Sequence, residues 1–304
     1  MLARRLLLLG LLAGTLLVPF PWRAPATTAL VDVPLANLGV APGRNGGADL
    51  ADQEMMGTVI TVLRQQGGWD WVGTARGYHG WVPAADLLLV QEQRAADWLH
   101  GPTARILVRR VTLAAGATGP ATGSTLLLGT TLPVIGERNG LVQLWLPDAG
   151  SGWVPAGDVL RLPAGVTAPP GGIPQVLALA RSLVGIPYVW GGTSVSGFDC
   201  SGFTQFVYGW YGYYIGRDVR NQWQSTVPVS DANRRPGDLV YFTTYQPGPS
   251  HVGIWLGGDA EFIAAGYRGV AVYSLDPHSP AYDPNLVGRY LGARRVIQAA
   301  GPPQ

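Results

Sequence analysis

The chain contains a single cysteine, Cys200, in the stretch FDCSGF at residues 198–203. A lone cysteine has no partner for an intramolecular disulfide, and most free cysteines are simply small buried hydrophobes. The residues after Cys200 favour a different interpretation, because apolar side chains recur at helical spacing as far as Trp210. The pattern places Cys200 in the first turn of a helix, with Asp199 as its N-cap.

A helix amino terminus gives such a thiol specific chemistry. Its unpaired backbone N–H groups carry partial positive charge, which is expected to favour the thiolate and to stabilise a developing oxyanion. The nucleophile then needs a base, most often a histidine. Three of the four histidines are poorly placed for this role: His79 and His100 in the N-terminal half, and His278 in a Pro/Asp-rich loop. His251 begins the apolar run HVGIWLGG, which predicts a strand, and is the expected base.

The composition narrows the possible functions. The 304 residues carry a formal charge of +2 without runs of basic residues, so a nucleic-acid partner has no support. His251 has no neighbour at metal-ligand spacing and there is no Cys/His cluster, so we expect no metal. The glycine-rich stretch GGTSVSG lacks the lysine of a phosphate-binding loop, and we expect no cofactor.

The first residues have the layout of a secretory signal. Arg4 and Arg5 precede an apolar core from Leu6 to Val18, and small residues follow it. This core is shorter than the ~20 apolar residues of a membrane span, although an uncleaved anchor is the alternative interpretation. We assign residues 1–29 to a signal peptide, expect membrane contact only through this segment, and expect an exported protein of the cell envelope or the extracellular space.

Two stretches of the N-terminal half repeat each other. They begin at Gly57 and Gly129, open with Gly-Thr and close with Gly-Trp-Val-Pro-Ala-x-Asp. In both, the closing tryptophan follows the opening glycine by 24 residues. Short alternating apolar runs, separated by turns such as the hairpin signal Asn139-Gly140, predict two small antiparallel β-barrels. We expect Trp153, the second closing tryptophan, to pack in a barrel core.

These patterns give the domain limits. The first barrel unit is expected at residues 30–92, the second at 93–162, and a Pro/Gly-rich linker at 163–174. The remaining unit, residues 175–298, begins with an amphipathic helix and contains the cysteine and histidine segments.

Five motifs of this last unit occur in a fixed order: PYVWGG, DCSGF, RPGDLVYF, SHVGIWLG and EFI. Together they resemble the NlpC/P60 family of cell-wall cysteine peptidases, over residues 173–296. The resemblance implies a papain-like α+β domain, and the two repeats before it resemble bacterial SH3-like domains that bind cell-wall peptide or glycan. The whole chain is similar to the γ-D-glutamyl-L-diamino acid endopeptidases, which trim peptidoglycan stem peptides.

The resemblance also implies roles for individual residues. Cys200 matches the nucleophile and His251 the general base. Tyr78, in the first SH3-like unit, matches a tyrosine that helps to bind the free amino end of the stem peptide. Five further residues match positions that line the substrate cleft: Tyr188, Trp190, Asp199, Ser201 and Asp218.

The sequence departs from the family pattern at two positions. Ala264 occupies the third catalytic position, which is usually polar and often histidine, and its side chain cannot hydrogen-bond an imidazole. Glu261 is near in sequence, but a three-residue offset in a strand points it to the opposite face. Thr58 stands where a glutamate that contributes to amine recognition is common, which weakens the expected preference for a free amino terminus.

The sequence therefore predicts an exported cysteine peptidase in which Cys200 attacks the γ-D-Glu–diamino acid bond of stem peptides. A thiolate is intrinsically nucleophilic, so the loss of the third residue is expected to slow hydrolysis without abolishing it. The main alternative is a catalytically weakened or inactive SH3-like wall-binding protein. An amidase or acyltransferase acting on a non-wall substrate has no separate support in the sequence.

Overall fold

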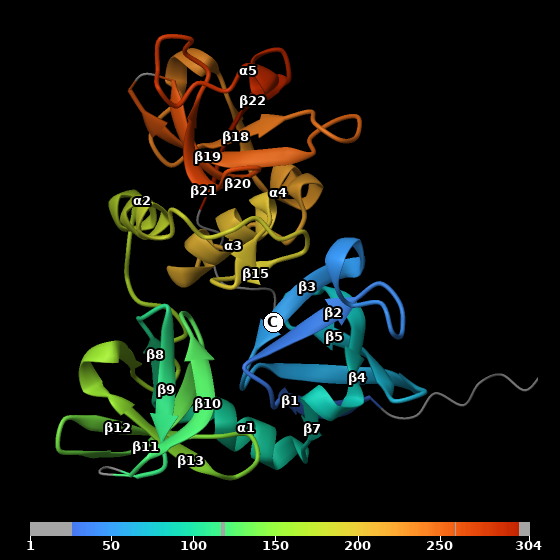
Figure 1. Cartoon of the computed structure of the whole chain (residues 1–304), viewed down its shortest axis with the longest axis vertical. Helices are drawn as coiled ribbons and strands as arrows, with labels where there is room; N and C mark the ends of the chain where they lie inside the picture. The colour runs from blue at the N-terminus through green and yellow to red at the C-terminus, as the bar shows by residue number, and fades with distance from the viewer. Residues whose placement is uncertain (1–25, 117–118, 259, 298–304) are drawn as a thin grey trace, which may run out of the picture.

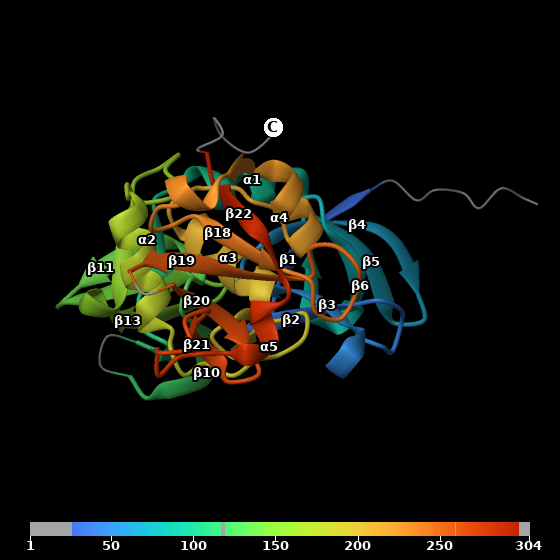
Figure 2. The ribbon, with the colours of Figure 1, turned by 90° about the horizontal axis from the view of Figure 1, so that it is seen from above.

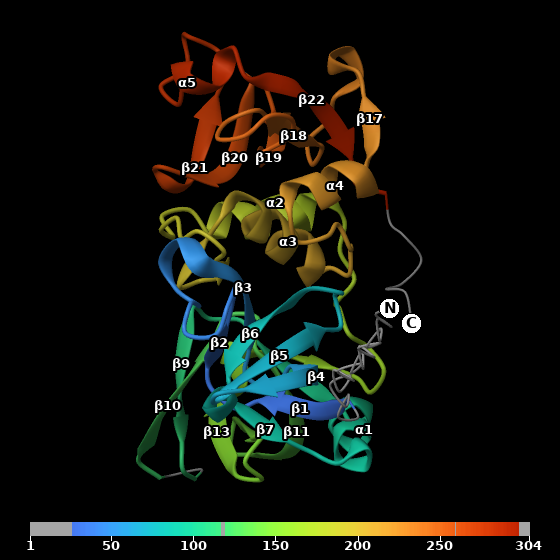
Figure 3. The ribbon, with the colours of Figure 1, turned by 90° about the vertical axis from the view of Figure 1, so that its right-hand side faces the viewer.

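The computed structural model describes residues 26–116, 119–258 and 260–297. In Figure 1 two N-terminal sheets lie below a layer of helices, and a third sheet lies above that layer. Seen from above, the first two sheets lie side by side, on opposite sides of the molecule (Figure 2). Figure 3 shows the same three layers from the side, with α3 and α4 between the third sheet and the strands of the first.

The first sheet has seven antiparallel strands in the order β3-β2-β6-β5-β4-β1-β7. They are β1 (Thr27–Val31), β2 (Leu35–Gly39), β3 (Leu50–Met55), β4 (Val59–Gln66), β5 (Trp69–Thr74), β6 (His79–Pro83) and β7 (Leu87–Leu89). The short 3-10 helices η1 (Gly47–Asp49) and η2 (Ala84–Asp86) precede β3 and β7.

The second sheet repeats this topology in the order β10-β9-β13-β12-β11-β8-β14. Its strands are β8 (Thr103–Ile106), β9 (Arg110–Ala114), β10 (Ala121–Leu127), β11 (Thr131–Arg138), β12 (Leu141–Trp145), β13 (Ser151–Pro155) and β14 (Val159–Leu162), with η3 (Ala156–Asp158) before β14. The internal repeat of the sequence is thus a repeat of the fold. The expected closed barrels are not formed, because each strand order ends in two edge strands with no pairing between them. Each sheet buries its own apolar face instead.

The turn and core predictions for the second unit have different outcomes. Asn139 and Gly140 have φ of 51° and 74° and join β11 to β12, which confirms the predicted hairpin. The expectation for Trp153 is wrong, since its side chain is only half-buried and lies outside the core. Side chains alternate along a strand, so Gly152 and Val154 face inward and Trp153 faces outward.

Helix α1 (Glu92–His100) connects and cross-links the two sheets. Trp98 is 3% exposed and packs in the core of the second sheet, together with Leu30 of the first. Its indole N–H donates to the carbonyl oxygen of Gly57 at 2.9 Å. One buried tryptophan therefore holds the first sheet against the second.

The C-terminal unit combines helices with a six-stranded antiparallel sheet of order β17-β22-β18-β19-β20-β21, which is the mixed arrangement expected of an α+β fold. Its elements are α2 (Ile173–Ser182), β15 (Thr193–Ser194), β16 (Gly197–Phe198), α3 (Cys200–Trp210), α4 (Val219–Ser225), β17 (Val227–Val229), η4 (Asp231–Asn233), β18 (Leu239–Phe242), β19 (His251–Gly257), β20 (Glu261–Gly266), β21 (Gly269–Ser274), α5 (Pro284–Val287) and β22 (Tyr290–Arg295).

Both faces of this sheet are covered. Helix α3 packs on one face, where Phe203 and Val207 join Val252 and Ile254 in the main core. The opposite face carries a second core that includes Leu286 of α5. Phe203 and Val207, which are among the regularly spaced apolar residues that predicted α3, are thus the residues that face the sheet.

The predicted signal peptide lies almost entirely outside the described residues. Its range, 1–29, overlaps the fold at β1, which starts at Thr27. Within residues 26–116, 119–258 and 260–297, no helix has the length and apolar character that crossing a membrane would require. The domain limits remain predictions from the sequence.

Candidate active site

Cys200 is the first residue of α3, as the sequence predicts. Asp199 caps this helix, because its Oδ1 accepts a hydrogen bond from the N–H of Gly202 at 2.6 Å. The other carboxylate oxygen accepts from the N–H of Gly191 at 3.0 Å. The cap fixes where α3 begins and hence where the sulfur lies.

A cavity of about 390 Å³ opens beside the sulfur. Cys200, Tyr188 and His251 line it together, with Tyr245 on the same wall. His251 is the first residue of β19, so helix α3 and the sheet that it covers supply the two groups. The structure thus brings the predicted nucleophile and the predicted base to one cavity.

The thiol is protonated in this environment. Burial raises the pKa of Cys200 to about 12, and the Asp199 carboxylate adds to the rise. The backbone N–H groups of Val252 and Ser201 donate to the sulfur and oppose the rise, as does the guanidinium of Arg217. The expected lowering of the thiol pKa is therefore wrong for the free protein, since the loss of water around the sulfur outweighs the donors.

The imidazole of His251 is neutral at neutral pH. Burial lowers its pKa to about 4, while the carboxylates of Asp283 and Asp199 oppose this shift. The ring packs beside Phe242, with 5.9 Å between the ring centroids. A neutral imidazole can accept the proton that a neutral thiol releases, so the pair is suited to attack assisted by a general base.

The side chain of Ala264 has no polar atom that could hydrogen-bond the His251 imidazole. It is fully buried in β20 and pairs with Ala271 of β21. Glu261 pairs with Ser274 at the far end of the same strand and does not line the cavity. The carboxylate that does line the cavity with His251 is that of Asp283, which the sequence analysis did not single out.

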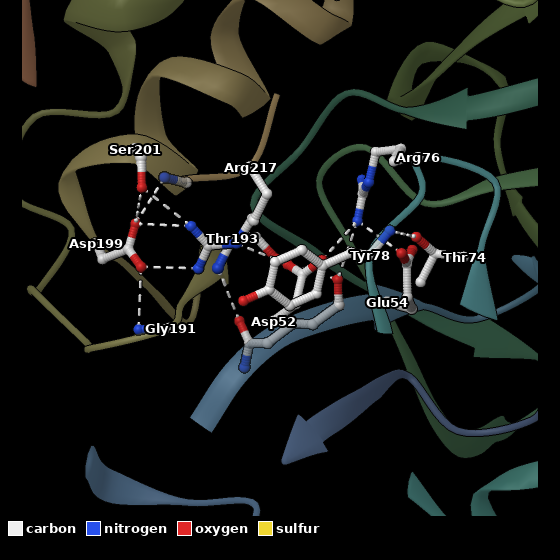
Figure 4. Close-up of polar contacts among 12 residues, drawn as sticks. Asp52, Glu54, Thr74, Arg76, Tyr78, Gly191, Thr193, Asp199, Ser201 and Arg217 are labelled. Atoms are coloured by element: carbon white, nitrogen blue, oxygen red, sulfur yellow. Dashed lines mark hydrogen bonds and ion pairs between the residues drawn. The ribbon is translucent and has the colours of Figure 1, made fainter. Parts of the chain in front are cut away.

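A buried ion-pair network joins the α3 cap to the first sheet (Figure 4). The guanidinium of Arg217 donates to both oxygens of Asp199, at 3.1 and 2.7 Å, and to the Ser201 hydroxyl at 3.1 Å. Its Nε donates to Oδ1 of Asp52, on β3, at 2.9 Å. Asp199 and Ser201, both expected in the substrate cleft, are thus held by a residue that also binds the first sheet.

A second contact reinforces this junction. The Oε1 of Gln53, next to Asp52 on β3, accepts hydrogen bonds from the Thr193 N–H at 3.0 Å and the Ser194 hydroxyl at 3.2 Å. These two residues form β15, which lies under the start of α3. The first sheet therefore contacts the elements on both sides of Cys200.

Tyr78, from the loop between β5 and β6, projects toward this network (Figure 4). Burial raises the pKa of Tyr78 to about 12, and the nearby carboxylate of Asp218 adds to the rise. Burial also raises the pKa of the Asp218 carboxyl, while Arg217 opposes that shift. Tyr78, which the resemblance assigns to the amine end of the substrate, and Asp218, which it assigns to the cleft lining, therefore lie within electrostatic reach of each other.

Thr58 has a carboxylate neighbour that the sequence analysis missed. The Thr58 hydroxyl hydrogen-bonds the side chain of Glu54, on β3. Arg76 contacts the same carboxylate at 2.6 Å, yet burial and the charge of Asp52 raise the pKa of Glu54 to about 7. Around Tyr78 there are more carboxylates than guanidinium groups: Asp52, Glu54, Asp199 and Asp218 against Arg76 and Arg217.

Tyr188 and Tyr245 line the cavity, and a further aromatic side chain, Trp190, contacts one of them. Trp190 is 43% exposed and makes an edge contact with Tyr245, with 5.3 Å between the ring centroids. Tyr188 lines the cavity beside Cys200, and burial together with the neighbouring Cys200 raises its pKa. These exposed rings can pack against an extended ligand.

Among the residues that the structure describes, no three His, Cys, Asp or Glu side chains are grouped as ligands for a metal ion. The arrangement at Cys200 is instead that of a thiol, an imidazole and backbone N–H groups around one cavity. Such a set can carry out nucleophilic acyl transfer.

Residues 185–299 match the NlpC/P60 family. This part of the chain is an NlpC/P60 domain. A crystal structure of an NlpC/P60 family protein from Bacillus cereus superposes with a TM-score of 0.76 at 25% identity, covering 89% of this chain and 100% of that chain. The membership confirms the predicted enzyme class, a cysteine peptidase.

Curated relatives resemble the chain over different lengths. The gamma-D-glutamyl-L-lysine dipeptidyl-peptidase of Bacillus cereus is 26% identical over 91% of this chain and 88% of its own length. The probable peptidoglycan endopeptidase LytE of Bacillus subtilis is 42% identical over 40% of this chain, which spans 34% of that relative. The first similarity therefore includes the N-terminal sheets, whereas the second extends over only 123 residues.

Proposed function

We propose that this protein is a peptidoglycan hydrolase in which Cys200 attacks the γ-D-Glu–diamino acid bond of stem peptides, with His251 as the general base. The observation that carries the proposal is the shared cavity of the two side chains, with the sulfur at the first residue of a helix. The names of the relatives, a gamma-D-glutamyl-L-lysine dipeptidyl-peptidase and a peptidoglycan endopeptidase, support the choice of substrate.

The proposed reaction starts from the neutral pair. As the Cys200 sulfur attacks the carbonyl carbon, its proton moves to the His251 imidazole, and N–H groups near the start of α3 stabilise the oxyanion. The imidazolium then protonates the departing amine, and a thioester remains on the sulfur. Neutral His251 next takes a proton from water, which attacks the thioester, and the acid product leaves as the thiol regains its proton.

The part of the cleft around Tyr78, next to the first sheet, is suited to a positively charged group of the substrate. The surplus of carboxylates around Tyr78 includes Asp218, and a free α-ammonium would complement it. Because Tyr78 lies in a loop between two strands of the first sheet, that loop would form one end of the cleft and limit access to short peptides with a free amino terminus. Glu54, which bonds Thr58, supplies a carboxylate beside the position where Thr58 replaces a glutamate.

The cavity beside Cys200 contains a guanidinium group as well as the carboxylate of Asp283. Of the described residues that line the cavity, Arg289 is the one with a permanent positive charge, and it donates to the carbonyl oxygen of Thr244 at 3.3 Å. This arrangement favours a leaving fragment with a carboxylate, such as a diamino acid at the end of a tripeptide. The carboxylates around Tyr78 and the guanidinium of Arg289 would thus complement the ammonium and the carboxylate of a short stem peptide.

We also propose an exported location. The signal layout in the sequence and the cell-wall role in the names of relatives support it. The two N-terminal sheets would be SH3-like modules, one of which contributes to the cleft.

The test is a digestion of L-Ala-γ-D-Glu-L-Lys and its diaminopimelate analogue, followed by mass spectrometry. The expected products of the full chain are L-Ala-γ-D-Glu and the free diamino acid. Cys200→Ala and His251→Gln should release neither. Equal product from the wild type and Cys200→Ala would contradict the proposal.

A weakened or inactive wall-binding protein is the second candidate, and two observations favour it. Ala264 occupies the usual third position, and burial raises the pKa of the Cys200 thiol. Sedimentation with purified cell walls distinguishes the two candidates when it is combined with the digestion. Tight retention on walls without any cleavage would favour the binding protein.

A further inference from the structure

The His251 imidazole needs a group that fixes its orientation, and this chain has no polar side chain at position 264. An imidazole that serves as a base is usually held in one tautomer by a hydrogen-bond acceptor on its far nitrogen. Such an acceptor must lie on the face of the sheet where His251 lies. Its negative charge must also not be neutralised by an ion pair with an arginine.

Asp283 lies on the required face. His251 and Trp255 are four residues apart on β19, so their side chains project from the same face of the sheet. Trp255 packs there with Phe242 and with Leu286 of α5. Asp283 is the N-cap of α5, and it lines the same cavity as His251.

The backbone holds Asp283 in place. Its N–H donates to the carbonyl oxygen of Ser274, at the end of β21, at 3.0 Å. Its Oδ1 accepts hydrogen bonds from the N–H and side-chain amide of Asn285, at 3.0 and 3.1 Å. These hydrogen bonds hold the backbone of Asp283 and one of its two carboxylate oxygens in place.

The charge of Asp283 is also available to the imidazole. The side chain is 1% exposed, and none of the ion pairs among the described residues includes it. Arg289 lines the same cavity but donates to the carbonyl oxygen of Thr244. Of the two carboxylates that act on the pKa of His251, Asp283 has the larger effect, and the other, Asp199, is paired with Arg217.

We propose that Asp283 is a positioning residue for His251 and takes over the part that Ala264 cannot perform. Its carboxylate accepts a hydrogen bond from the imidazole N–H that points away from Cys200, and so leaves the other nitrogen free to accept the thiol proton. During attack it stabilises the imidazolium and remains ionised. This inference rests on the proposed peptidase function.

The test compares Asp283→Asn with wild type in the full chain. Asparagine caps a helix as well as aspartate does, so α5 is retained while the charge is lost. The expected result is a kcat reduced by about 10- to 100-fold with KM changed less than about twofold. Asp283→Glu should recover part of the kcat because it restores the charge.

Asp276→Asn is the matched control. Asp276 lies in the same loop and accepts a hydrogen bond from the N–H of His278 at 2.9 Å, but it does not line the cavity. Its kcat should equal that of the wild type, and both variants should show similar thermal unfolding. An Asp283→Asn variant as active as the wild type would overturn the inference while the peptidase function stands.

A second measurement does not depend on activity or on the folding of a variant. In the wild-type chain labelled with ¹⁵N-histidine, His251 should populate one neutral tautomer, assigned by comparison with His251→Gln. A mixture of both tautomers would overturn the inference, including the case in which no stem peptide is cleaved.

Discussion

The Oδ1 atom of Asp52, in the first sheet, lies 2.9 Å from the Nε of Arg217, which lies beside helix α3. Asp52 is fully buried and Arg217 is 3% exposed. The same guanidinium holds both oxygens of Asp199, the cap of α3. The first sheet is therefore coupled by two consecutive ion pairs to the residue that fixes Cys200.

Arg217→Met should destabilise the protein strongly. The substitution leaves the carboxylates of Asp52 and Asp199 buried without their common cation, which typically costs about 3–5 kcal/mol. Urea unfolding would measure this loss. Arg161→Met is the control, because Arg161 pairs with Glu137 at an exposed position, where water and salt screen the ion pair and it contributes little to stability. Equal effects of the two substitutions would contradict the role of the buried network.

Tyr78→Phe should weaken the binding of peptides with a free amino terminus. The ring and its packing remain, but the hydroxyl that faces the carboxylate-rich end of the cleft is lost. We expect KM to rise about 10-fold, with kcat nearly unchanged, the size expected for one hydrogen bond to a charged group. The comparison with an N-acetylated peptide is the control, and a similar rise in KM for both peptides would argue against amine recognition by Tyr78.

The pH profile should reflect the lowered pKa of the His251 imidazole. Since the pKa of His251 is lowered to about 4, the base stays neutral well below the ordinary histidine value of 6.5. We therefore expect kcat/KM to be maintained to about pH 5 and to fall toward about pH 4, as the imidazole takes up a proton. An NMR titration of His251 in the free protein should give the same value. A fall in kcat/KM near pH 6.5, together with an NMR titration midpoint near pH 6.5, would show that the imidazole is solvated.

The stability of the fold should depend on the charge of Glu54. Its pKa is raised from 4.5 to about 7 in the folded protein, so the contribution of the protonated carboxyl to stability is lost as the pH rises through this interval. Glu54→Gln cannot lose that proton. Its unfolding free energy relative to the wild type should therefore increase by roughly 2–3 kcal/mol between about pH 4 and about pH 8. A difference that is independent of pH would contradict the raised pKa.

Local signals in the sequence were sufficient to predict the helix that begins at Cys200. The apolar spacing after Cys200 and the capping aspartate Asp199 are both contained within a few residues, and α3 begins where they indicate. Asn139 and Gly140 specified a hairpin in the same way, because both positions require positive φ. Local signals could not predict which face of the strand Trp153 occupies, since a shift of one residue in an alternating strand moves every side chain to the opposite face.

The electrostatics of the site depend on contacts between distant segments. A helix terminus predicts a lowered thiol pKa, but Cys200 is buried in the main core with Val252 and Ile254, which lie elsewhere in the sequence. No motif indicates that Arg217 pairs with Asp52 of the first sheet. Asp283 does carry a local signal, an Asp-Pro pair at the start of a short helix, but only the return of its loop to β21 reveals its position beside His251.

The most direct measurement is the intact mass of the protein, quenched in acid during turnover of L-Ala-γ-D-Glu-L-Lys. The account predicts a transient species heavier by one L-Ala-γ-D-Glu acyl group, attached to Cys200 and absent from Cys200→Ala. Product release by wild-type protein without such an adduct on Cys200, and undiminished in Cys200→Ala, would contradict it.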